Sequence, residues 1–208
     1  MTGVVTALAG ALATMCGRFA DGEPADVAAR AEDLQIRAAS LAEADLVVYA
    51  AYVQARREKL GTAKVAAALD EATRVPLELA EIAAELAQIA AELARSGNPR
   101  LRGDAMAGLL MAAAATRAAA ILVCENLGGA TVGDEPRLAL AATLVASVDA
   151  AELASLSVYP ALTRRPSADT PMNWPGRTPT IGNPAAQRAE RSAEHERRAH
   201  DYDAEPHR

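Results

Sequence analysis

The stretch between Pro24 and Gly61 constrains the fold most, because its 36 residues include neither glycine nor proline. Apolar side chains recur along it in alternating steps of four and three. They are Val27, Ala31, Leu34, Ala38, Leu41, Val48, Tyr52 and Ala55. This spacing places them on one face of a single continuous helix, and Pro24 suits the first helical turn. The chain is therefore predicted to be built on long helices.

Composition supports helices throughout. About a quarter of the residues are alanine, the best helix former, and only 3% are aromatic. Strand-forming residue types are scarce, so a β-sheet is not expected. We predict an all-α fold, namely an up-and-down helical bundle of about five long helices with an extended C-terminal arm.

The other four helices follow from their start and stop signals. Short connections between long helices favour antiparallel neighbours. Pro76 lies inside the third helix of the chain and predicts a kink or break near Arg74–Val75. Asp134 is expected to cap the last helix. The four helices are predicted at Thr2–Phe19, Thr62–Ser96, Leu101–Leu127 and from Pro136 to about Leu162.

The chain changes character at residue 165. Residues 1–164 are predicted to form the helical domain, and 165–208 a Pro-rich arm and polar C-terminal tail. The arm contains the only tryptophan, Trp174. Two interpretations stay open for this segment: disorder, or docking on the same or a neighbouring subunit.

Several classes of protein are disfavoured. A formal net charge of −6 argues against nucleic-acid binding. All three histidines lie in the tail, and there is no cysteine cluster, so no metal site is expected. Cys16 and Cys124 are predicted to be reduced core residues of a cytoplasmic protein. Ala105–Cys124 is apolar but is expected to be a buried helix, not a membrane span.

Two charged residues occupy apolar helical positions. Asp45 lies on the apolar face of the second helix, where a carboxylate needs a partner or a functional reason. Arg117 is the only charged residue between Asp104 and Glu125, and it needs a carboxylate from the protein or from a ligand. The protein-based alternative pairs Arg117 with Asp45 or Asp104.

Three further residues have structural explanations beside functional ones. Asp104 falls in the first turn of its helix, where a negative charge stabilises the free amides. Tyr49 and Tyr52 are expected to be mainly core aromatics whose hydroxyl groups need partners.

Several motifs together resemble the cyclodeaminase and methenyltetrahydrofolate cyclohydrolase family. Gly97-Asn98-Pro99 followed by Asp104 is similar to the family's GNPN..SD segment before a long Ala-rich helix that ends in N-L, here Asn126-Leu127. Other elements match in order. They are Ala72-x-x-Val75-Pro76-Leu77 for A..VPL, Asp45-x-x-x-Tyr49 for D..AY/F, and Ala7 to Leu12 for the end of GGGSVAALAGAL.

The resemblance implies a helical, usually dimeric enzyme acting on one-carbon units of tetrahydrofolate. It implies no covalently bound cofactor, with a tetrahydrofolate derivative as the possible substrate. Carboxylates suit the amidinium-like cation of this chemistry. Asp45 and Asp104 are therefore the candidate catalytic residues. The candidate substrate-binding residues are Arg117, Tyr49, Tyr52, Glu125, Asn126 and Gly3.

Some ligand-loop residues of the family pattern are replaced. Of its glycine-rich turn only Gly3 remains, Val4 stands at its serine, and Leu122 and Gly103 replace an asparagine and a serine. The favoured hypothesis is an enzyme acting at a C–N centre of a folate unit, or of a different imine or iminium in specialised biosynthesis. The alternative is a non-catalytic helical dimer that serves as a binding or scaffold protein.

Overall fold

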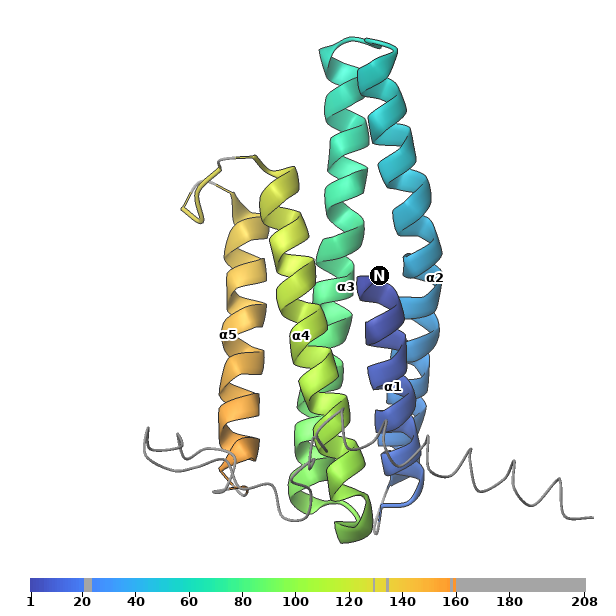
Figure 1. The fold of residues 1–208 in the computed structure, drawn as a ribbon, viewed down its shortest axis with the longest axis vertical. Helices are drawn as coiled ribbons and strands as arrows, with labels where there is room; N and C mark the ends of the chain where they lie inside the picture. The colour runs from blue at the N-terminus through green and yellow to red at the C-terminus, as the bar shows by residue number, and fades with distance from the viewer. Residues whose placement is uncertain (21–23, 129, 134, 158, 160–208) are drawn as a thin grey trace, which may run out of the picture. The chain divides into compact units, whose positions relative to one another are not determined.

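The computed structural model describes residues 1–20, 24–128, 130–133, 135–157 and 159. Within them the regular elements are all helices, joined by short connections (Figure 1). The predicted all-α bundle is therefore confirmed, whereas the predicted C-terminal arm lies outside the described residues. The elements are α1 (Thr2–Arg18), α2 (Pro24–Arg57), α3 (Thr62–Ser96), the 3₁₀ helix η1 (Pro99–Leu101), α4 (Arg102–Asn126) and α5 (Pro136–Leu156).

Helix α3 lies at the centre of the bundle and packs on all four other helices. Its own side chains Leu79 and Leu86 are fully buried. Helix α1 packs on α2 and α4, and α5 packs on α3 and α4. Figure 1 shows α2 and α3 continuing beyond the start of α1 as a hairpin. The far part of this hairpin therefore lacks the cover that α1 gives to the rest of α2.

The predicted apolar face of α2 is the face that packs inward. Ala31, Leu34 and Ala38 have no exposed surface. Farther along, Leu41, Val48 and Tyr52 are only half-buried. The periodicity thus identified the correct face, and Ala55 near the hairpin turn is buried again.

A row of glycines on α1 allows it to lie very close to α2. Gly3, Gly10 and Gly17 recur every seven residues and face Ala42, Gln35 and Ala28 respectively. A Cβ added at Gly3 would lie 2.6 Å from the Ala42 Cβ, and one added at Gly10 would lie 2.8 Å from the Gln35 Cβ. These distances are shorter than van der Waals contact, so the packing requires glycine at these positions.

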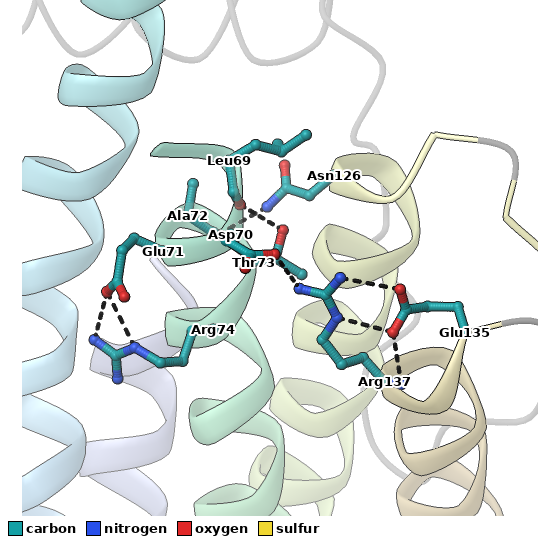
Figure 2. Close-up of polar contacts among 9 residues, drawn as sticks. All are labelled: Leu69, Asp70, Glu71, Ala72, Thr73, Arg74, Asn126, Glu135 and Arg137. Atoms are coloured by element: carbon teal, nitrogen blue, oxygen red, sulfur yellow. Dashed lines mark hydrogen bonds and ion pairs between the residues drawn. The ribbon is translucent and has the colours of Figure 1, made fainter. Parts of the chain in front are cut away.

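Helix α3 continues through Pro76 without interruption. The break that Pro76 predicted near Arg74–Val75 is therefore not found. Proline has no N–H, so the carbonyl of residue 72 loses its usual helical donor. Figure 2 shows what replaces it: the Asn126 side chain donates from Nδ2 to the Ala72 carbonyl oxygen at 2.8 Å. A side chain of α4 therefore completes the hydrogen bonding of α3.

This compensation predicts a coupled effect on stability. Asn126→Ala should lower the free energy of unfolding by about 1–3 kcal/mol, because the carbonyl of buried Ala72 loses its donor. In a Pro76→Ala background the cost should shrink, since residue 76 then supplies an N–H. Urea unfolding followed by circular dichroism measures both. Gln54→Ala, which removes an exposed amide, is the control. If Asn126→Ala lowered the free energy of unfolding equally in both backgrounds, Asn126 would not be compensating for the missing N–H of Pro76.

The start of α5 corrects one prediction. The cap is Glu135, whose side chain accepts a hydrogen bond from the Arg137 backbone N–H, and not Asp134. The Arg137 guanidinium also bonds Glu135 and reaches Asp70 of α3 at 2.8 Å (Figure 2). These hydrogen bonds from Arg137 lower the pKa of Glu135 to about 2. Arg137 thus ties the start of α5 to α3.

Two helical segments, Pro99–Asn126 and Pro136–Leu156, are long and apolar enough to cross a membrane by length and composition. Half of the apolar window in the first is buried inside the protein, and 22% of that in the second. The core helix of a soluble protein passes the same test, so this finding is weak support for a membrane span. The expected cytoplasmic, membrane-free state stays a prediction.

Candidate functional site

Asp45 lies where α2 emerges from beneath α1. The first turn of α1 meets α2 at Ala38 and Ala42, and Asp45 follows less than one turn later. Its side chain is half-buried on the inward face of α2. Within the described part of the chain, Asp45 has no hydrogen bond or ion pair. No cation among the described residues therefore neutralises this carboxylate.

The two tyrosines near Asp45 differ in environment. Tyr52 is half-buried, and its ring lies 5.9 Å from the guanidinium carbon of Arg56. Tyr49 is 56% exposed, so its expected place in the core is wrong. The two ring centroids are 6.4 Å apart. Tyr49 is exposed because α1, whose first turn packs on Ala42, does not extend to this level of α2.

Gly3, a predicted substrate-binding residue, lies inside a helix and not in a ligand-binding turn. It lies within the first turn of α1 and is buried against Ala42. Its contacts give it a packing role, and it is the glycine of the row nearest to Asp45.

Asp104 lies near the opposite end of α1. It is exposed in the first turn of α4. Together with burial, its charge raises the pKa of the Cys16 thiol. The Cys16 thiol also donates to the Leu101 carbonyl at 3.8 Å. Since Gly3 and Cys16 are 13 residues apart on α1, Asp45 and Asp104 are separated by about 20 Å along the helix. One subunit therefore does not bring the two carboxylates together.

Arg117 pairs with neither of the two predicted aspartates. Its Nε and Nη2 donate to Asp149 Oδ1 at 2.9 and 2.6 Å, and Nη2 donates to Glu152 Oε2 at 2.6 Å. Both partners are on α5. These hydrogen bonds, that to Glu152 first, raise the pKa of Arg117. Arg117 lies on the side of α4 that faces α5, whereas α1 packs on α4 near Gly108. Arg117 therefore reaches the acids of α5 and not Asp45 or Asp104.

The two other predicted residues of α4 do not join a common site with Arg117. Glu125 is exposed. Asn126 is occupied by the Ala72 carbonyl. The sequence did not predict this structural role of Asn126. The signal that could have indicated it is a proline inside one helix together with an asparagine in another.

A groove between α4 and α5 was missed by sequence analysis. Its volume is about 820 Å³. Cys124 lines it and is exposed, so its predicted burial is wrong, whereas Cys16 is buried as predicted. Arg117 and Asp149 lie at one end, and the walls are mostly apolar. They include Ala120, Ile121, Val132, Leu138, Ala142, Val145 and Ala146. Asp149 follows the uncharged stretch 138–148 of α5, which is the sequence signal that could have identified it.

The acidic side chains of the described residues form no metal-binding arrangement. In the described ranges, no group of three or more His, Cys, Asp or Glu side chains could hold a metal ion.

Comparisons with known proteins agree with this architecture. The profile of the formiminotransferase-cyclodeaminase family matches residues 1–139. Among solved structures, formiminotetrahydrofolate cyclodeaminase from Thermotoga maritima is similar, with a TM-score of 0.70 and 21% identity. The similarity covers 77% of this chain and 86% of that one. No curated protein matches the chain.

Proposed function

Because this chain belongs to the formiminotransferase-cyclodeaminase family, we propose that it is an enzyme acting at a cationic C–N centre. The substrate is a one-carbon unit on tetrahydrofolate or a different imine or iminium compound. The observation that carries this proposal is that Asp45 is a half-buried residue whose carboxylate has no ion-pair partner among the described residues. A positive charge in the substrate would supply the missing partner.

The role of Asp45 follows from the chemistry of an amidinium-like carbon. A nearby carboxylate stabilises the delocalised cation. It can also accept a proton from the water or nitrogen that adds to this carbon, and return it to the nitrogen that leaves. In hydrolysis, water forms the new C–O bond and one C–N bond breaks. In cyclodeamination, a second nitrogen of the substrate adds to the carbon and closes a new ring, and ammonia leaves.

We further propose that the active form is a homodimer, and that the dimer brings Asp104 to the site. The surface that α1 and α4 share carries exposed apolar or small side chains. We call it the α1–α4 face, and it comprises Val4, Leu8, Ala107, Ala114, Ala118 and Leu122. Helix α1 has no charged side chain before Arg18. A surface of this kind is typical of the core of a homodimer interface.

Symmetry explains how two distant carboxylates can act together. Asp45 and Asp104 lie at opposite ends of the α1–α4 face, as the contacts of Gly3 and Cys16 with their neighbours indicate. A two-fold axis across the middle of this face makes the α1 helices antiparallel. It thereby places one end of a subunit against the opposite end of its partner. Each of the two sites would then combine Asp45 of one subunit with Asp104 of the other.

A direct assay tests the activity. The protein is incubated with 5,10-methenyltetrahydrofolate, and loss of substrate absorbance is compared with that in buffer. Ammonia release from 5-formiminotetrahydrofolate is measured in parallel. We expect catalysed loss of at least one substrate if folate chemistry is retained. Turnover of a cyclic imine but of neither folate would indicate the other substrate class. Inactivity toward all three would favour a non-catalytic helical dimer, which the exposed α1–α4 face would also explain.

A further inference from the structure

The α4–α5 groove has the dimensions of a small-molecule site. Its volume of about 820 Å³ falls within the range of ligand-binding pockets. The floor is formed by the buried side chains Ala120, Leu138 and Ala141. Exposed Ile121 and Val132 form part of its walls. An apolar group placed there would remove these side chains from water, and this removal favours binding.

The polar end of the groove carries an excess of negative charge. One guanidinium, that of Arg117, meets two carboxylates, those of Asp149 and Glu152. The cluster therefore has a net charge of minus one. Arg117 donates to only one oxygen of each carboxylate. The other oxygens, Asp149 Oδ2 and Glu152 Oε1, accept no hydrogen bond from the residues that the structure describes.

From this combination we propose that the groove binds a small organic cation with an apolar body, such as an arylalkyl ammonium or an amidinium. The apolar body would lie along Ile121 and Val145. The positive group would reach Asp149, the carboxylate that lines the groove. A cation is favoured over an anion because it balances the charge of the cluster, whereas an anion would add to it.

This site is separate from the proposed catalytic carboxylate. The groove lies on the α5 side of α4, while Asp45 is on α2 beyond the start of α1. The inference therefore does not depend on the proposed function. A cation bound here would be a second ligand of the protein.

Cys124 provides a reporter for the test. It lines the groove and is exposed, while Cys16 is buried. The rate at which N-ethylmaleimide alkylates Cys124 is measured with benzylammonium, with neutral benzyl alcohol and with benzoate. We expect benzylammonium to slow alkylation at concentrations at which the other two have no effect. Calorimetric titration of benzylammonium gives the dissociation constant.

Two variants make the outcome specific. Asp149→Asn keeps the shape of the side chain, and it should weaken benzylammonium binding about tenfold or more. Ala142→Phe should fill the groove and remove protection of Cys124. Asp33→Asn is the matched control, since Asp33 is an exposed carboxylate in an ion pair with Arg30 on α2. Circular dichroism confirms that each variant is folded.

Three results would overturn the inference. They are equal protection of Cys124 by all three probes, stronger protection by benzoate, and unchanged benzylammonium affinity in Asp149→Asn. The first would indicate only apolar contact, and the second would make Arg117 the recognising group. The third would remove Asp149 from cation binding.

Discussion

Asp45→Asn should reduce turnover of the accepted substrate about 10²- to 10⁴-fold, which is the usual contribution of a positioned acid–base group. The amide keeps the size of the side chain but can neither carry the negative charge nor accept a proton. The loss should appear mainly in kcat if the carboxylate acts on the transition state more than on the bound substrate.

The control for this variant is a neighbouring carboxylate on the same helix. Glu43 is exposed two residues before Asp45, and Glu43→Gln should retain nearly full activity. Both variants should unfold at the same urea concentration as the parent protein. Parental turnover in Asp45→Asn would exclude Asp45 from the mechanism and leave the family membership unaffected.

Asp45→Asn and Asp104→Asn subunits should restore activity when they are mixed. Each variant alone would form dimers in which both sites lack one carboxylate. In a mixed dimer, one site lacks both carboxylates and the other has both. Random exchange of subunits should therefore recover about a quarter of the parental activity. The measurement is kcat after unfolding and refolding the two variants together, compared with refolding each alone.

The oligomeric state of the refolded proteins distinguishes the ways in which the mixing experiment could fail. Size-exclusion chromatography establishes whether the refolded proteins are dimers. Dimers without recovered activity would contradict a site shared between subunits. A monomeric, active parent protein would contradict the dimer itself. Introducing a charge on the α1–α4 face, as in Leu8→Glu, should abolish both the dimer and the recovery.

The sequence predicted those features of the fold that depend on local spacing. The face of α2 that contains Leu34 followed from helical periodicity alone. The start of α3 at Thr62 and its end at Ser96 followed from flanking glycines. In both cases the determining residues lie within a few positions of one another, so local rules were sufficient.

The contacts between helices were harder to predict. Arg117 clearly required a carboxylate, but its partners Asp149 and Glu152 lie 32 and 35 residues away, and the chain offers many acids. Tyr49 was placed in the core because its helix was amphipathic, although periodicity does not tell where a neighbouring helix ends. Asp45 and Asp104 were grouped by motif, and motifs carry no information on the distance between them.

The hydrogen bond from Asn126 to Ala72 has a consequence for biosynthesis of the chain. Its donor follows its acceptor by 54 positions. During translation, all of α3 is therefore made before the donor for this carbonyl exists. Until α4 leaves the ribosome, only water can donate a hydrogen bond to the carbonyl of Ala72. That turn of α3 therefore stays prone to opening. This turn of α3 would thus complete its hydrogen bonds only when α4 docks on it.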